Sequence, residues 1–152
     1  MNRVLLDASL AGPAGQVHGL RLQRLARRFL KSLALDSVEL SLSLVRDRQI
    51  QALNKQWRDK DKATDVLSFP AGELVGPGLR QLGDVIISLE TAKRAAPDFG
   101  STLEHELALY LAHGLLHLLG HDHHTKREAR AMQKLEVVLL GHAGMLARSD
   151  EV

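Results

Sequence analysis

The sequence predicts an α+β fold, in which a small four-stranded sheet is backed by about five helices. Short segments that alternate between apolar and polar residues, typical of half-buried strands, are separated by segments whose apolar residues recur at helical spacing. The expected order is strand, helix, strand, helix, strand, strand and then three helices. One of the last helices is apolar over most of its surface, which indicates a central helix that is packed on several sides.

The composition narrows the class of protein. At 152 residues the chain can bury a core, and we expect residues 1–152 to form a single domain. The absence of cysteine excludes disulfides and thiolate metal sites, so His, Asp or Glu must hold any transition metal. A formal net charge of +2 and a pI of about 9.2 suit a polyanionic partner without requiring one. No apolar run approaches the length of a membrane span or a signal peptide, so we expect a cytoplasmic protein that does not bind membranes.

The region before residue 70 is expected to contain three strands and two helices. Residues 37–45 alternate between apolar and polar, which predicts a strand with one buried face. Apolar residues recur at helical spacing over 19–34, and Asp47 is a candidate N-cap for a second, shorter helix. We interpret a basic flank on the first helix as a solvated face. The remaining features are a strand at 4–7, a turn at 11–16 and a strand at 66–69, and the basic flank comprises Arg21, Arg24, Arg27, Arg28 and Lys31.

The rest of the chain is expected to contain one strand and three helices. Glycines and prolines at 71–81 predict a loop or hairpin connection, which a strand at 84–87 follows. Ser88 is expected to cap the next helix, and capping boxes that begin at Ser101 and Thr125 are expected to open the last two helices. The last helix is expected to place four residues in the core, namely Met132, Leu135, Val138 and Leu139.

Histidines are concentrated in one short stretch, since six of the eight lie between His105 and His124. His113 and His117 are four residues apart and therefore share one face of a helix. Gly120 can end that helix in a left-handed conformation, which lets the chain turn back and bring His123 to the first two. Three converging neutral imidazoles predict a site for a zinc-like ion with a fourth position for water, as in catalytic zinc sites. The central helix is therefore expected to be the metal-bearing helix.

The spacing His-x3-His-x2-Gly-x2-His is also that of the metzincin zinc peptidases. Those enzymes have a glutamate directly after the first histidine as general base, whereas this chain has Gly114. A zinc metallopeptidase is therefore an alternative that the missing carboxylate weakens. A solvated, histidine-rich helix end is a further alternative, which the third histidine at this spacing disfavours.

A second group of polar residues lies between Asn54 and Pro70. Arg58, Lys60 and Lys62 put positive charge near an edge of the sheet, and the Arg58 guanidinium can hold two phosphate oxygens at once. A surface loop whose alternating charges screen one another remains open as an interpretation. The spacing alone does not place this loop beside the histidines.

Both groups resemble the YbeY family of bacterial metal-dependent endoribonucleases. Residues 113–123 follow the family signature His-Gly-x-Leu-His-Leu-x-Gly-Tyr-Asp-His at every fixed position but one, and residues 54–70 and 83–88 resemble two further blocks. This resemblance implies a zinc-dependent, single-strand-specific endoribonuclease. It implies His113, His117 and His123 as the ligands of one Zn²⁺ per chain, and Arg58 as an active-site residue.

The resemblance also implies a biological role. The expected substrate is a single-stranded ribosomal RNA precursor, processed in ribosomal RNA maturation at the small-subunit 3′ end and in ribosome quality control. The expected partners are the ribosome or small-subunit assembly factors. A non-catalytic ribosome-assembly factor with a structural metal is kept as another alternative, and it requires that protein groups fill all four metal positions.

Two residues depart from the family pattern. Ala63 stands where the family usually has proline, which is expected to loosen the charged loop slightly. His121 stands where the family usually has tyrosine, only two residues from His123. It can compete as a ligand or act as a proton donor, but we expect it to face the rim of the cleft.

Overall fold

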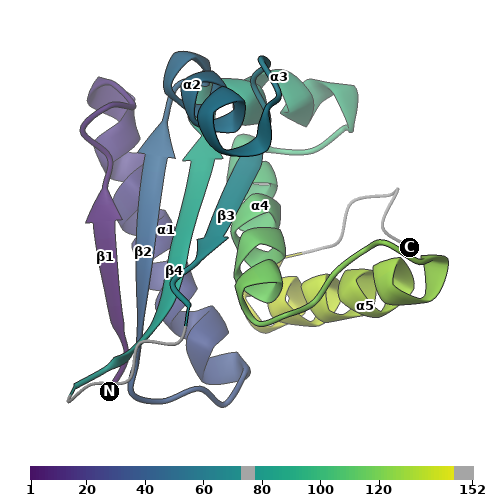
Figure 1. Ribbon diagram of the computed structural model, residues 1–152. Helices are drawn as coiled ribbons and strands as arrows, with labels where there is room; N and C mark the ends of the chain where they lie inside the picture. Colours follow the sequence, from purple (N-terminus) through teal and green to yellow (C-terminus); the bar gives the residue numbers. More distant parts are fainter. Residues whose placement is uncertain (73–77, 146–152) are drawn as a thin grey trace.

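One mixed sheet lies at the centre of the fold, with its strands in the order β1-β2-β4-β3. The computed structural model describes residues 1–72 and 78–145, and within them the elements follow one another as predicted (Figure 1). Neighbours among β1, β2 and β4 are parallel, and β3 is antiparallel to β4. The α+β prediction is thereby confirmed. The elements are β1 (Arg3–Asp7), α1 (Pro13–Ser32), β2 (Val38–Val45), α2 (Asp47–Arg58), β3 (Val66–Pro70), β4 (Arg80–Ser88), α3 (Leu89–Asp98), α4 (Leu103–Leu118) and α5 (Lys126–His142).

The two faces of the sheet bury different cores. The alternation in β2 turns Leu40, Leu42 and Leu44 toward one face, where they join the main core with α1 and α4. On the opposite face, a smaller cluster under α2 includes Ile50 and Ile86. Among the helices of the described residues, none combines the length and the apolar character that a membrane span would need.

The helix α4 is central, as its apolar surface predicts. It packs against β3, β4, α1, α3 and α5, and in Figure 1 it stands beside β3 with α5 running across its lower end. The helix approaches the sheet closely at Gly114, where an added Cβ would lie 2.8 Å from Val85 Cγ1 and 3.2 Å from Val66 Cγ2. Metzincins have their general base at the residue that corresponds to Gly114. Here the side chains of the sheet fill the space beside Gly114, so a glutamate at this residue would clash with them.

Several local predictions differ from the structure. The helix α1 begins at Pro13, inside the expected turn, because proline is well suited to the first position of a helix, where its missing N–H is not needed. The N-cap of α4 is Thr102, not Ser101, and its hydroxyl accepts a hydrogen bond from the N–H of His105 at 3.1 Å. Val138 is 49% exposed instead of buried, since it lies outside the face of α5 that packs on α4.

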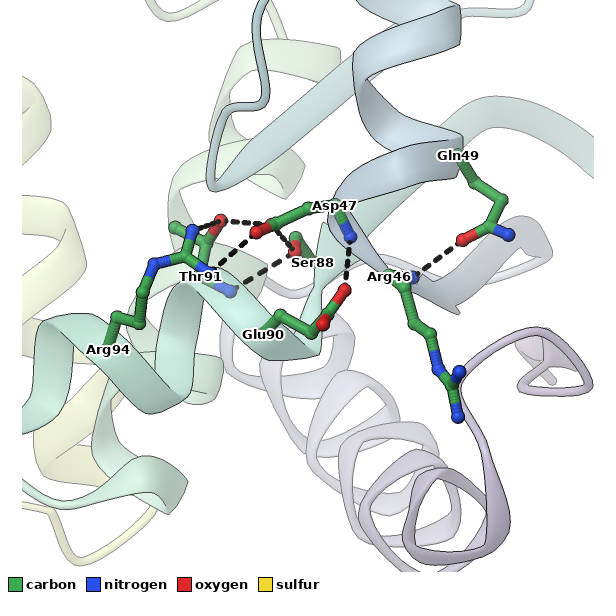
Figure 2. A network of polar contacts seen from close by, with 7 residues as sticks. All are labelled: Arg46, Asp47, Gln49, Ser88, Glu90, Thr91 and Arg94. Atoms are coloured by element: carbon green, nitrogen blue, oxygen red, sulfur yellow. Dashed lines mark hydrogen bonds and ion pairs between the residues drawn. The ribbon is translucent and has the colours of Figure 1, made fainter.

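Asp47 is the first residue of α2 and not its cap. Its carboxylate accepts hydrogen bonds of 2.6 Å from the hydroxyls of Ser88 and Thr91 and forms an ion pair of 2.6 Å with Arg94 (Figure 2). Its N–H donates to the carboxylate of Glu90 at 2.8 Å. This network connects the beginnings of α2 and α3, so the aspartate stabilises the junction of two helices.

Replacing Asp47 by asparagine is expected to destabilise the protein in a pH-dependent way. Burial raises the pKa of this carboxyl, but hydrogen bonds from Arg94, Ser88 and Thr91 outweigh burial and hold the pKa below its usual value. A lowered pKa stabilises the fold above the ordinary aspartate pKa, and this contribution is lost as the pH falls through the folded-state value. Because solvent screens the exposed Arg94, we expect Asp47→Asn to lower the free energy of unfolding by about 1–2 kcal/mol at pH 7.

Urea denaturation from pH 7 down to the lowest pH at which the wild type stays folded measures this difference. The gap between wild type and Asp47→Asn should shrink as the pH falls, because both side chains are then uncharged. Asp98→Asn, which removes an exposed carboxylate at the end of α3, is the matched control. A gap that stays constant with pH would show that the charge of Asp47 does not contribute.

Candidate metal centre

The end of α4 brings the third histidine back to the first two. Gly120 has φ 96°, the left-handed conformation that the sequence predicts. The N–H of Gly120 bonds to the carbonyl of His117, and the N–H of His121 bonds to the carbonyl of Leu116, both at 3.0 Å. These two bonds form a Schellman motif, which satisfies the last carbonyls of the helix and reverses the chain. The reversal places His123 opposite the helix face that carries His113 and His117.

The structure brings His113, His117 and His123 together. Each offers one ring nitrogen, and these three atoms lie within 4.8 Å of one another. The Nε2 atoms of His113 and His117 are 3.1 Å apart, and the ring centroid of His123 lies 5.7 Å and 5.1 Å from those of the other two. His121 does not belong to this group. Three nitrogen donors that converge on one point suit a zinc-like ion.

A carboxylate orients the first of these rings. Nδ1 of His113 lies 2.6 Å from Oε1 of Glu136 on α5, whose side chain is only 7% exposed. A buried carboxylate at this distance makes Nδ1 the donor, which leaves the lone pair of Nε2 for a ligand. Neither the histidine motif nor its spacing predicts Glu136 as part of this site. The sequence feature that could have identified Glu136 is a charged residue on the buried face of α5, between Met132 and Leu139.

The surroundings keep His117 suitable as a ligand. Burial lowers the pKa of His117, and the nearby His113 and His123 lower it further. The neutral form, which metal coordination requires, is therefore favoured. A hydrogen bond from the N–H of His123 lowers the pKa of the Asp122 carboxyl, so an ionised carboxylate lies beside the cluster.

The charged loop after α2 lies beside the histidines, which the spacing alone did not establish. A cleft of about 680 Å³ is lined by Arg58, Lys60 and Lys62 and also by the three histidines and Gly114. The loop is held against α2, where the side-chain amide of Asn54 donates to the carbonyl of Lys62 at 3.0 Å. Positive charge and candidate metal ligands therefore share one cleft, an arrangement that suits a phosphate group.

Two contacts hold Arg58 at the edge of this cleft. One guanidinium nitrogen donates to the carbonyl of Ser68 at 2.9 Å, and the guanidinium carbon lies 5.5 Å from the centroid of the Phe69 ring. A guanidinium has five N–H donors, so this hydrogen bond leaves others for an anion. Arg58 is therefore positioned to bind a phosphate beside the histidines.

The basic flank of α1 does not belong to this site. Arg21 and its neighbours are exposed, and Arg21 pairs with Glu104 at 3.6 Å. Arg21, Arg24 and Arg28 line a separate hollow of about 430 Å³, which contains none of the three clustered histidines.

Comparisons with known proteins identify clear relatives. A family model described as "Endoribonuclease YbeY" matches residues 14–144. A protein of Myxococcus xanthus with the same description is 64% identical over 129 residues, which cover 84% of this chain and 44% of that protein. One from Anaeromyxobacter dehalogenans is 49% identical over 134 residues, covering 88% and 69%. A solution structure of a Thermotoga maritima protein aligns with a TM-score of 0.59 and 27% identity, covering 95% of this chain and 92% of that one. The chain thus spans less than half the length of the first of these relatives.

Proposed function

Because the chain belongs to the YbeY family, we propose that it is a metal-dependent endoribonuclease that cleaves single-stranded RNA in ribosomal RNA maturation. The observation that carries this proposal is the shared cleft, where three histidine nitrogens lie beside Arg58, Lys60 and Lys62. A cluster of metal ligands next to a cationic wall suits the hydrolysis of a phosphodiester, whose charge increases during the reaction.

We propose that His113, His117 and His123 hold one zinc ion per chain. Three imidazole nitrogens, a chain without cysteine and the orienting carboxylate of Glu136 fit this ion. When bound, zinc supplies Lewis-acid chemistry that makes water available as a nucleophile near neutral pH.

Residues of the protein perform the other catalytic roles. Arg58 binds the phosphodiester and stabilises the negative charge that builds up on it, and the two lysines draw the RNA backbone into the cleft. Asp122 and Asp65 are carboxylates that line the cleft and can accept a proton. Gly114 cannot take this role, and the sheet packed against it explains why no glutamate stands there.

The biological role of the protein is also proposed from its membership of the family. We propose that the substrate is a ribosomal RNA precursor, cleaved at the small-subunit 3′ end, with a further part in ribosome quality control. The proposed partners are the ribosome or small-subunit assembly factors, in the cytoplasm. Residues 1–152 are proposed to act as a single metal-dependent hydrolase domain.

Two alternatives fit less well. The peptidase needs a general base where Gly114 packs on the sheet. The non-catalytic assembly factor needs four protein ligands, whereas the cluster found among the described residues contains three. Three protein ligands would leave a fourth position for water, as in catalytic zinc sites.

The proposed function is tested by cleavage of a labelled single-stranded RNA, its duplex form and a peptide library, each with zinc-loaded protein and with protein treated with a chelator. Cleavage of the single strand alone, lost with the chelator and restored by zinc, is the expected result. Cleavage of peptides would favour the peptidase instead. No cleavage by protein with one bound metal per chain would favour the assembly factor.

Replacing Arg58 by glutamate is expected to lower kcat/KM for RNA about 10²–10³-fold, because the stabilising charge at the phosphate is removed and reversed. Metal content should stay unchanged, since Arg58 does not belong to the histidine cluster. Metal analysis together with cleavage kinetics checks both statements. Arg48→Glu, the same charge change at an exposed position of α2 outside the cleft, is the control. Metal lost from Arg58→Glu would mean that this residue supports the metal site.

A further inference from the structure

A second cavity adjoins the histidine cluster on the side of α3 and α5. Its volume is about 610 Å³, and it shares His113, His123 and the beginning of β3 with the cleft that contains Arg58. Its walls are mainly apolar and include Phe99, Tyr110 and Met132. A group bound in this cavity would therefore touch the same histidines as a phosphate in the cleft.

The two hollows differ in charge. Arg58, Lys60 and Lys62 line the first, whereas the described residues that line the second include neither lysine nor arginine. Carboxylates do not distinguish them, since Asp65 lines both hollows, with Asp122 in the first and Glu136 in the second. A phosphate is thus attracted to the first hollow, and an uncharged, largely apolar group is suited to the second.

The wall of the second cavity exposes an aromatic ring. Phe99, directly after α3, is 44% exposed, although large apolar side chains are usually buried. Aromatic rings that remain accessible beside a nucleic-acid cleft are the surfaces on which unpaired bases stack. Gln133 of α5 is an exposed residue of the same cavity, and its amide offers both a donor and an acceptor. Together the two side chains suit a flat ring with polar edges.

We propose that this cavity is a nucleobase subsite. While the scissile phosphate lies between the histidines and Arg58, the base of a neighbouring nucleotide enters the cavity, stacks on Phe99 and forms hydrogen bonds with Gln133. The inference rests on the proposed ribonuclease function and deepens it. A base can enter only when it is unpaired and unstacked, so the subsite supplies a physical reason for single-strand specificity.

Cleavage kinetics test the subsite in the zinc-loaded protein. Phe99→Ala is expected to lower kcat/KM for a short single-stranded RNA about tenfold or more, mainly by raising KM, and Phe99→Trp should retain cleavage. Leu20→Ala removes another apolar side chain that is 44% exposed, on α1, and should leave the kinetics unchanged. Equal urea midpoints and metal contents ensure that the variants are comparable. Wild-type kinetics in Phe99→Ala would overturn the proposal. The alternative occupant of the cavity would then be an apolar side chain of a protein partner.

A binding measurement separates this inference from the proposed function. In Phe99→Trp, adenosine monophosphate should quench the fluorescence of the new indole by stacking, and ribose 5-phosphate should not. The same titration of the wild type, whose single tryptophan is Trp57, gives the background. If the wild type cleaves no RNA, selective quenching by the nucleotide still supports the subsite while the ribonuclease proposal fails. Equal responses to both ligands would overturn the subsite even in an active ribonuclease.

Discussion

The His117→Ala variant is expected to lose RNA cleavage and most of its bound metal. His117 supplies one of three converging nitrogens, and its ring faces the Nε2 atom of His113 at 3.1 Å. Two imidazoles alone hold a zinc ion too weakly. When the ion is lost, its Lewis-acid stabilisation of the transition state, worth several kcal/mol, is lost too. We therefore expect kcat/KM to fall by about a thousandfold or more. Metal analysis and cleavage of labelled RNA, with both proteins purified side by side, measure the effect.

The matched control is His121→Ala. His121 follows Gly120 in the same turn but lies outside the histidine cluster. The substitution therefore removes the same imidazole group without removing one of the three clustered histidines. It should keep one metal per chain and near-normal cleavage. Undiminished cleavage by pure His117→Ala would contradict the metal hydrolase. Loss of metal from His121→Ala, with the fold intact, would add this histidine to the ligand set.

The second large effect is expected from Glu136→Gln. The amide preserves the shape of the side chain and an oxygen that can accept from His113, but it removes the negative charge that strengthens the imidazole as a ligand. We expect metal affinity to fall about 10–100-fold. Cleavage should fall at limiting zinc and return at excess zinc, because the ligands themselves are intact. Competition with a chromogenic chelator measures the affinity.

Glu128→Gln, a neutralised and exposed carboxylate in the first turn of α5, is the control for the loss of charge from this helix. Unchanged zinc affinity in Glu136→Gln, accompanied by a lower free energy of unfolding, would assign Glu136 to stability alone. A loss of cleavage that excess zinc does not restore would instead assign it a part in proton transfer.

Local contacts explain which predictions succeeded. The spacing of His113 and His117, and the left-handed Gly120 that returns the chain to His123, all lie within eleven residues, 113–123. The hydrogen bonds of that turn also join residues only three or five positions apart. Helix caps are local too, but neighbouring residues compete for them, which is why Thr102 caps α4 where Ser101 was expected. Asp47 forms bonds with α3 instead of capping α2, a choice that depends on residues more than forty positions away.

The sequence by itself determined the order of the elements, the apolar central helix and the cluster of three histidines, because periodicity and short-range turns encode them. Only the tertiary structure decided what surrounds that cluster. Pairing of β3 with β4 and packing of α4 on both bring Arg58 to the histidines and leave no space for a side chain at Gly114. Packing of α5 on α4 brings Glu136 to His113. These contacts join residues far apart in the chain, and no spacing within one segment specifies them.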